Sequence, residues 1–209
     1  MEFMEINLRA MRTEDYEPIL KLVITTWDYR SWVPKRLVEP MAEFFLSDLL
    51  QRSDHIMIAE VDGKIAGICA GDILEYSRMQ RFSLRKKTHA LGAILAYTEK
   101  GSIFEKYIQT MELDQELLLQ SGREFDGSLN LLIVVKAYQG LGLGKLLYNN
   151  FCEYLKKNGA RSFYLYTDDS SDYAFYKYQG MQKLAQKTFY WDDIGEDNTE
   201  LYFLYGKEI

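Results

Sequence analysis

Three glycines alternate with leucines in the stretch QGLGLGKLL, at Gly140, Gly142 and Gly144. A nearly continuous apolar segment, residues 128–135, comes before them, and an amphipathic pattern with helical spacing, residues 142–158, follows at once. The apolar segment predicts a strand that is buried on both faces, and the later pattern predicts a helix that buries one side. The chain must therefore pass from a buried strand into a helix through a backbone with few side chains.

This arrangement favours a loop that binds an anion. The first backbone N–H groups of a helix have no partner within the helix, and the helix dipole places partial positive charge there. Glycines leave those groups uncovered, so that a phosphate or pyrophosphate can approach them closely. We therefore expect a phosphorylated ligand at this loop, although a plain turn from strand to helix is the structural alternative.

Two familiar phosphate-binding motifs do not fit the stretch. The Walker A loop needs a glycine where Gln139 stands and a hydroxyl residue where Leu146 stands. The dinucleotide-binding fingerprint needs a third glycine where Lys145 stands, within a βαβ unit that the first half of the chain does not resemble. A nucleotide enzyme with a phosphate loop is therefore the disfavoured reading.

The run from Gln139 to Gly144 instead resembles the acyl-CoA loop of the GNAT superfamily of N-acetyltransferases, whose pattern is Gln/Arg-x-x-Gly-x-Gly/Ala. A second motif, AFYKYQGM at residues 174–181, is similar to the Phe-Tyr-x-x-x-Gly-Phe helix of that family, with Met181 in place of the usual phenylalanine. The order of the expected elements agrees with the family over residues 6–72 and 127–207. The resemblance does not extend to the segment between them.

Periodicity and turn residues give the remaining elements. Before the glycine loop we expect a strand at residues 6–11, a helix at 13–27 with Thr13 as its N-cap, a helix at 41–50, and a hairpin at 55–73 that turns at Asp62-Gly63. After the loop helix, which ends at Gly159, we expect a strand at 162–167, a short helix capped by Ser170 or Ser171 and ended by Gly180, and two closing strands at 183–191 and 200–207 joined by a turn at 192–199.

These elements predict an α/β (α+β) fold with a central mixed, mostly antiparallel sheet flanked by helices on both faces. The resemblance implies that the sheet splays between its fourth and fifth strands to admit CoA. We expect a single domain, residues 1–209, with a helical insertion at about 74–125. Charge runs in the insertion are interpreted as solvated faces. Its helices are expected to cover the acceptor side of the site and to set substrate choice.

The resemblance also implies which residues hold acetyl-CoA, the expected co-substrate. Backbone groups of Val134, Val135 and Lys136 would pair with the pantetheine arm like an added strand. The backbone amides of the loop would hold the pyrophosphate; these residues are Gln139, Gly140, Leu141, Gly142, Leu143, Gly144 and Lys145.

For the chemistry, the resemblance implies direct attack of a neutral amine on the thioester. The amide of Val134 or its neighbour resembles the donor that stabilises the oxyanion. Tyr176 stands where the family places its general acid, and a phenol suits the protonation of an alkyl thiolate. Tyr173 and Tyr178 are the next candidates for this acid.

The general base stays open. Many relatives carry a glutamate on the fourth strand, where this chain has Ser128 and Asn130. Asp126 or Asp72 would act through water, or the amine would lose its proton on the way in. Asp168 and Asp169, which precede the short helix that carries Tyr176, are expected to shape the turn before Ser170 or to attract a cationic amine.

Composition narrows the class of partner and the compartment. The net charge of −6 disfavours nucleic acid, and no apolar run approaches the length that crosses a membrane. Two cysteines and two histidines make neither a disulfide framework nor a zinc site, so we expect no metal and a reducing cytoplasm. The predicted function is N-acetylation of a primary amine of a small molecule or peptide by a monomer or homodimer. A non-catalytic acyl-CoA-binding regulator is the alternative.

Overall fold

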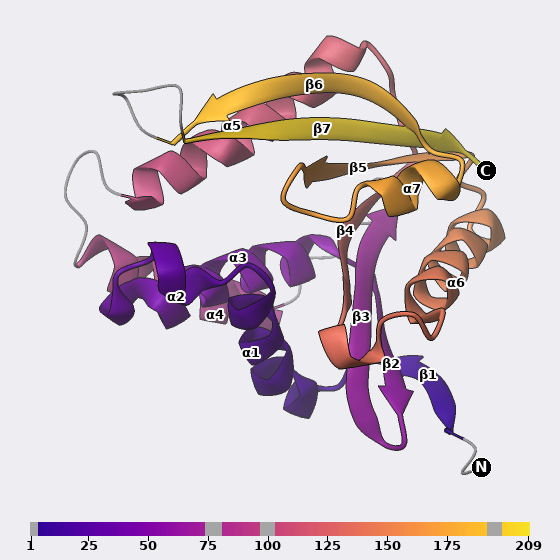
Figure 1. Ribbon diagram of the computed structural model, residues 1–209, viewed down its shortest axis with the longest axis horizontal. Helices are drawn as coiled ribbons and strands as arrows, with labels where there is room; N and C mark the ends of the chain where they lie inside the picture. Colours follow the sequence, from indigo (N-terminus) through magenta and orange to yellow (C-terminus); the bar gives the residue numbers. More distant parts are fainter. Residues whose placement is uncertain (1–3, 74–80, 97–102, 192–197) are drawn as a thin grey trace.

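The computed structural model describes residues 4–73, 81–96, 103–191 and 198–209 (Figure 1). Within these residues, seven strands form one sheet. The strands are, in chain order, β1 (Ile6–Ala10), β2 (His55–Val61), β3 (Lys64–Ile73), β4 (Gly127–Val134), β5 (Ser162–Asp168), β6 (Gln182–Tyr190) and β7 (Thr199–Glu208).

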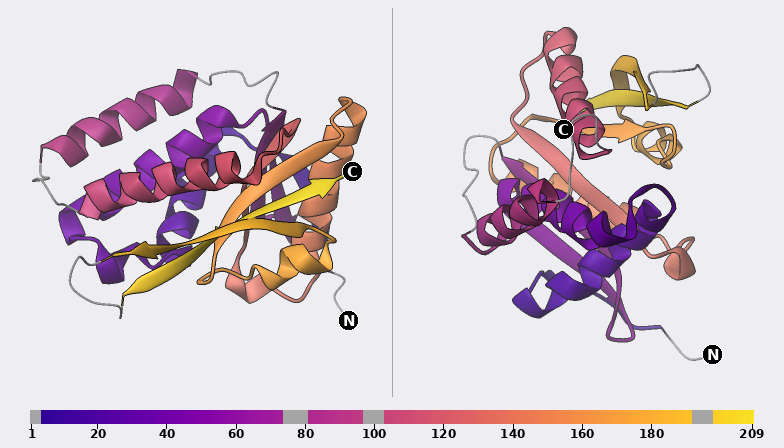
Figure 2. Two further views of the ribbon diagram at one scale, coloured as in Figure 1. Left: turned by 90° about the horizontal axis from the view of Figure 1, so that it is seen from above. Right: turned by 90° about the vertical axis from the view of Figure 1, so that its left-hand side faces the viewer.

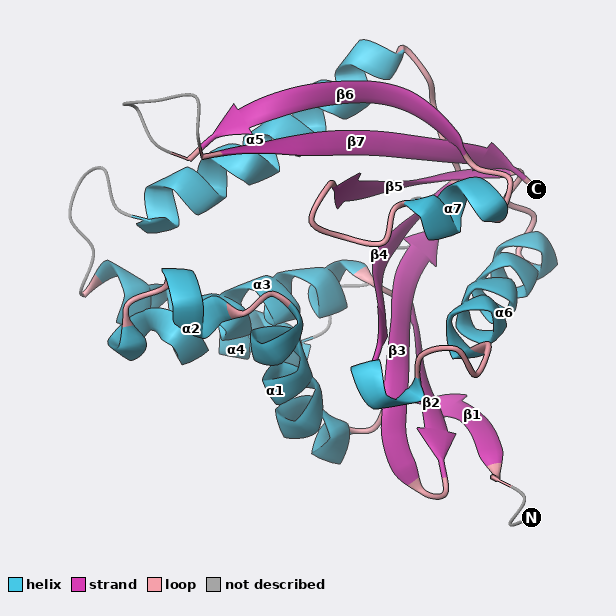
Figure 3. Ribbon diagram, in the orientation of Figure 1, coloured by secondary structure: helices cyan, strands magenta, loops and turns pink. Residues whose placement is uncertain are grey.

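The sheet has the order β1-β2-β3-β4-β5-β7-β6, and all neighbours are antiparallel except β4 and β5. That parallel pair is short: only Gly127 and Ser128 of β4 face partners, Phe163 and Tyr164, on β5. Beyond Ser128 the two strands diverge, and β5 runs almost across β4 (Figure 3). The predicted mixed, mostly antiparallel sheet is therefore confirmed, and it consists of two halves joined at one end.

Helices cover both faces of this sheet. They are α1 (Tyr16–Thr26), α2 (Tyr29–Trp32), α3 (Val38–Arg52), α4 (Arg81–Leu95), α5 (Ile103–Ser121), α6 (Leu143–Lys157) and α7 (Ala174–Tyr178), with short 3-10 turns at Thr13–Asp15, Lys35–Leu37 and Lys136–Tyr138. Helices α6 and α7 lie on one face, and α1 to α4 lie on the other (Figures 1 and 2). None of the helices in the described residues has the length and apolarity that a membrane crossing requires.

Helix α6 packs closely on β3 because β3 carries a glycine at the contact. A Cβ atom on Gly71 would lie 2.4 Å from Cε2 of Phe151 and 2.6 Å from the carbonyl oxygen of Ser128. Leu147, Phe151 and Leu155 of α6 are fully buried at this interface. The apolar stripe read from the sequence is thus the face that holds the loop helix against the sheet.

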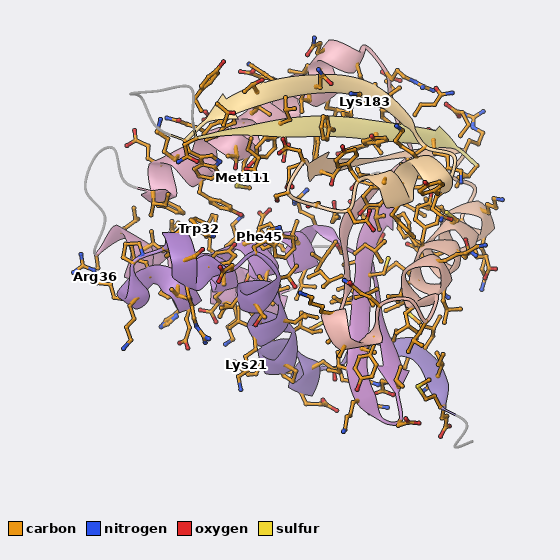
Figure 4. The ribbon with its side chains drawn as sticks, viewed as in Figure 1. Lys21, Trp32, Arg36, Phe45, Met111 and Lys183 are labelled. Carbon is orange, nitrogen blue, oxygen red and sulfur yellow. The ribbon has the colours of Figure 1, made fainter. Side chains whose placement is uncertain are left out.

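Helix α5 joins the two halves of the sheet on the face opposite α6. Its first half, with Phe104, Tyr107 and Met111, packs into the core of α1 to α3. Its second half, with Leu113 and Leu117, packs on β5, β6 and β7. In Figure 4 the side chain of Met111 points from α5 toward the layer that holds Trp32 and Phe45. The helix therefore crosses the region where β4 and β5 diverge.

The elements expected from the sequence are largely confirmed. The hairpin turns at Asp62 (φ 50°) and Gly63 (φ 72°), and α4 and α5 lie in the segment 74–125 where helices are predicted. The first helix begins differently: a 3-10 turn holds Thr13, and the amide of Arg12 donates to Asp15 Oδ2 at 2.7 Å, so Thr13 is not the N-cap. Residues 192–197 of the expected turn at 192–199 lie outside the described residues.

The prediction that Ser170 or Ser171 caps α7 is also wrong, because both side chains bond elsewhere. The hydroxyls of Ser170 and Ser171 donate to Asp168 Oδ1, at 2.6 and 2.9 Å, and Tyr173 stands at the N-cap position. The serines therefore stabilise the turn after β5 rather than the helix. Gly180 (φ 77°) follows the end of α7 as expected.

Candidate active site

The end of β4 presents alternate backbone groups to its two sides. The N–H of Val135 donates to the carbonyl oxygen of Ala66 at 2.8 Å, so the backbone of Val135 faces β3. Because successive residues of a strand face opposite edges, the backbone of Val134 faces the side from which β5 has diverged. Among the three residues predicted to contact pantetheine, Val134 thus presents its backbone at the open edge of β4. Lys136 begins the 3-10 turn that follows.

The loop then folds back on the end of β4. The Gln139 amide donates to the carbonyl oxygen of Lys136 at 3.3 Å, while its side-chain Nε2 lies 3.4 Å from the carbonyl oxygen of Val134. Gly140 and Gly142 follow with φ angles of 82° and 80°, which other residues rarely adopt. A Cβ atom on either glycine would meet nothing within 4 Å, and Leu141 between them is exposed. The loop therefore leaves its backbone open on its outer side.

Helix α6 starts directly after the loop. Its first hydrogen bond runs from the N–H of Leu146 to the carbonyl oxygen of Gly142, at 3.0 Å. The amides of Leu143, Gly144 and Lys145 come before it and have no acceptor among the described residues. The Lys145 side chain is exposed at the same turn. The start of α6 thus combines free donors, a helix dipole and a cation, which suits a phosphorylated group.

Tyr176 lies on α7 and faces the same region. Its half-buried ring packs in the apolar cluster that includes Val134 and Leu132 of β4, and its centroid is 6.3 Å from that of Tyr205. Its hydroxyl makes no hydrogen bond within the described part of the chain. Burial, with smaller effects from Cys69 and the acids Asp168 and Asp172, raises the pKa of Tyr176 above its ordinary value. The phenol is therefore protonated at neutral pH and has a proton to give.

The two neighbouring tyrosines are placed differently. The ring of Tyr173 packs on Phe203 at a centroid distance of 5.2 Å, and the side chain of Tyr178 is 87% exposed. Tyr178 therefore lies in solvent. The geometry therefore favours Tyr176 over Tyr178 as the candidate acid.

The polar residues of β4 form a closed network with Asp72. Ser128 Oγ donates to Asp72 Oδ1 at 2.5 Å, and Asn130 Nδ2 lies 3.5 Å from the same oxygen and 3.0 Å from Ser53 Oγ. Burial raises the pKa of Asp72, and the hydrogen bond from Ser128 opposes that rise. These side chains satisfy one another and tie the end of α3 to β4.

The other candidate bases shape turns. The Asp126 carboxylate accepts from the amides of Arg161 and Ser162, at 2.7 and 3.1 Å, and the hydrogen bond from Arg161 is the main cause that lowers the pKa of Asp126. Asp169 accepts from the amide of Leu201 at 3.1 Å. Together with Asp168, these acids stabilise the ends of β5.

Asp114 on α5 is a further acid of interest that local sequence patterns do not single out. Its Oδ1 atom is buried and has no hydrogen-bond partner among the residues that the structure describes, and burial raises the pKa of Asp114 to about 8. The segment MELDQELLLQ was interpreted as a charged, solvated face. The signal was nevertheless present, because Thr110, Leu113 and Leu117 mark a buried stripe at helical spacing and Asp114 lies on the same side.

Comparison with protein families gives one match. The sequence model of the acetyltransferase (GNAT) family matches residues 22–181, which include the glycine loop and the helix that carries Tyr176. A search of curated proteins finds no significant match.

Solved structures share the fold at low sequence identity. The protein SsHAT is 15% identical, covers 98% of each chain and superposes with a TM-score of 0.67. The ribosomal-protein-S18-alanine N-acetyltransferase from Escherichia coli is 14% identical, with 98% of this chain and 94% of that chain covered and a TM-score of 0.56. The PaiA N-acetyltransferase from Thermoplasma acidophilum, in complex with coenzyme A, is 14% identical, with 99% and 100% covered and a TM-score of 0.55.

Proposed function

Because the chain belongs to the acetyltransferase (GNAT) family, we propose that it transfers the acetyl group of acetyl-CoA to a primary amine of a small molecule or peptide. The observation that carries the proposal is the divergence of β4 from β5 beside the glycine loop. It leaves a strand edge, a set of free helix amides and a protonated phenol around one region. An acyl thioester with a pyrophosphate tail fits all three.

In this proposal acetyl-CoA lies along the end of β4. The amides of Leu143, Gly144 and Lys145 bind the pyrophosphate, with Gly140 and Gly142 allowing close approach. The pantetheine arm pairs with the open backbone edge at Val134, as an added strand would. The amides of Val135 and Gln139 already have hydrogen-bond partners, so this proposal does not use them to bind acetyl-CoA.

The reaction is a direct acyl transfer. The lone pair of the neutral amine attacks the thioester carbonyl carbon, a C–N bond forms, and the carbonyl oxygen becomes an oxyanion. A backbone N–H at the open edge of β4, that of Val134, stabilises this charge. The C–S bond then breaks, the thiolate leaves, and the ammonium nitrogen loses one proton.

Tyr176 supplies the proton that the thiolate needs. Its phenol is protonated at neutral pH, lies in the cluster that contains the end of β4, and has no competing hydrogen bond within the described residues. The resulting tyrosinate regains a proton from solvent. For the proton of the amine, Asp126 is a poor base because its pKa is lowered, so the amine enters neutral or releases its proton to water.

The alternative is an acyl-CoA-binding regulator without turnover. It is supported by β4 itself, which carries Ser128 and Asn130 bonded to Asp72 and presents no free carboxylate. A thiol-release assay with acetyl-CoA and a panel of polyamines, amino sugars, amino acids and peptide N-termini separates the two. Amine-dependent release supports the enzyme. CoA binding without release from any amine supports the regulator.

The remaining expectations stay predictions. They are a cytoplasmic location, no metal requirement, no nucleic-acid or membrane partner, and a monomer or homodimer. A nucleotide enzyme with a phosphate loop is the third reading, and competition of ATP with CoA binding tests it. We expect ATP to compete only weakly, through the diphosphate that the two molecules share.

A further inference from the structure

A carboxyl group with one buried oxygen lies where α5 crosses from one half of the sheet to the other. Met111 belongs to the core of α1 to α3, and Leu117 belongs to the core under β5, β6 and β7. Between them the inward side of the helix carries Asp114, whose Oδ1 atom is buried and meets no hydrogen-bond partner within residues 4–73, 81–96, 103–191 and 198–209. An unsatisfied buried oxygen is an acceptor with which a donor group of a ligand can pair.

Two more carboxyl groups and several phenols surround this position. Asp168 at the end of β5 is within electrostatic reach of Asp114, as are Tyr166 and Tyr202. On strands β5 and β7, Asp168 pairs with Tyr202, and Glu200 lies two residues earlier on the same face. Three carboxyl groups therefore gather on the side of the sheet that α5 covers, away from α6.

The hydrogen bonds around this cluster leave Asp114 as its open acceptor in the described part of the chain. Arg52 at the end of α3 is within reach of Asp114, and it donates to Asp48 at 3.1 Å. Glu200 Oε2 accepts from Trp191 Nε1 at 3.1 Å and from the Tyr202 hydroxyl at 2.9 Å. Asp114 Oδ1 has no such donor in the described part of the chain, so the cluster offers an acceptor to a ligand that brings its own N–H groups and positive charge.

Aromatic faces close the same region. Trp191 at the end of β6 contacts Trp32 of α2 at a centroid distance of 6.0 Å, so the two halves of the protein also meet here. Aromatic rings beside carboxyl groups favour an alkylammonium over a hydrated metal ion. In the described residues no group of three acids, histidines or cysteines has the arrangement that holds a metal.

We infer that Asp114, with Glu200 and Asp168 beside it, binds an ammonium group of the acceptor, and that the acceptor is an alkyl diamine or polyamine. The inference rests on the proposed acetyl transfer and names the substrate class for it. An ammonium paired with a carboxylate has no lone pair and cannot attack a thioester. The nitrogen held at Asp114 is therefore not the one that is acetylated, and the acceptor needs a second amino group that reaches β4 uncharged.

The test compares two amines of equal chain length in the thiol-release assay, 1,4-diaminobutane and butylamine. We expect the wild-type protein to prefer the diamine through KM, by about tenfold to a hundredfold, the range for one charge-assisted hydrogen bond. Asp114→Asn keeps the shape and removes the charge, so it should abolish that preference. Glu112→Gln makes the same charge change at an exposed position of α5 and should retain it.

Calorimetric titration of 1,4-diaminobutane into the CoA-saturated protein separates this inference from the proposed function. Diamine binding that Asp114→Asn removes, without thiol release, supports the site and contradicts acetyl transfer. Thiol release with equal KM for the two amines supports acetyl transfer and overturns the site. Equal diamine affinity in wild type and a folded Asp114→Asn protein also overturns it. Glu200→Gln, which can still accept from Trp191, gives a second variant with a smaller expected loss.

Discussion

The ring of Phe175 lies against Gly144: a methyl group added to that glycine would sit 3.6 Å from Cε2 of Phe175 and 3.7 Å from Cγ2 of Val134. Phe175 also makes an edge contact with Tyr148 of α6, at a centroid distance of 5.8 Å. Phe175, the residue next to Tyr176, therefore packs against the first turn of α6. The glycine loop and the helix of the candidate acid thus form one packed unit, although about thirty residues separate them in the sequence.

Gly142→Val should abolish CoA binding. A valine side chain would cover the amides at the start of α6, and at φ 80° it would also strain the backbone by about 1–2 kcal/mol. Isothermal titration with CoA measures the effect. Gly159→Val is the matched control, because Gly159 has φ 81°, equally open surroundings and a place at the other end of α6. Unchanged CoA affinity in folded Gly142→Val would contradict the proposal that this loop binds the pyrophosphate.

Tyr176→Phe should lower single-turnover acetyl transfer by about a hundredfold to ten-thousandfold and leave CoA affinity unchanged. Phenylalanine keeps the packing of the ring on Tyr205 and removes only the proton donor. Tyr173→Phe, which alters a ring that packs on Phe203, is the control and should retain turnover. If Tyr176→Phe transfers acetyl groups at nearly the wild-type rate, another group protonates the thiolate.

Asp114→Asn should stabilise the free protein at high pH and have little effect at low pH. Burial raises the pKa of Asp114 from an ordinary 3.8 to about 8 in the folded protein, so the folded state holds this proton more tightly than the unfolded chain does. Stability from this group is complete below the lower value and is lost as the pH rises toward the higher one. Thermal unfolding at pH 4, 6 and 8 tests this, and a difference that shrinks as the pH rises would contradict it.

Gly71→Ala should destabilise the fold by about 1–3 kcal/mol, because the new methyl group would overlap the Phe151 ring and the Ser128 carbonyl oxygen. Gly92→Ala on α4 is the opposite case. A Cβ atom there meets nothing within 4 Å, and alanine in place of glycine in a helix stabilises by about 0.5–1 kcal/mol. Urea unfolding of both variants gives the comparison. Equal stability of the two would show that α6 does not pack on β3 as described.

The sequence predicted the fold well where the signals were local. The turn at Asp62-Gly63 and the helix between Gly142 and Gly159 depend on residues within a few positions of one another, and both are confirmed. The cap of α7 could not be read in this way. Ser170 has the right residue type for a cap, yet its hydroxyl donates to Asp168, which precedes it in the turn.

The candidate site was predictable in part for the same reason. The glycine motif is continuous in sequence, and so is the motif that holds Tyr176. The role of Asp126 depends on the amides of Arg161 and Ser162, about 35 positions away, which a local pattern does not reveal. Asp114 was missed for a different reason: it lies in a charged segment whose helical stripe is weak, and the packing of α5 across both halves shows that this acid faces inward.

The divergence of β4 from β5 has a consequence for hydrogen exchange. The amide of Val135 is bonded to β3, and that of Ile133, two residues earlier, faces the same way; the amides of Leu132 and Val134 face the edge that β5 has left. Deuterium should therefore enter this one strand in an alternating pattern, with every second amide protected and its neighbours open. A bound acyl donor paired along that edge would make the strand uniform, so the alternation itself reports whether the gap in the sheet is filled.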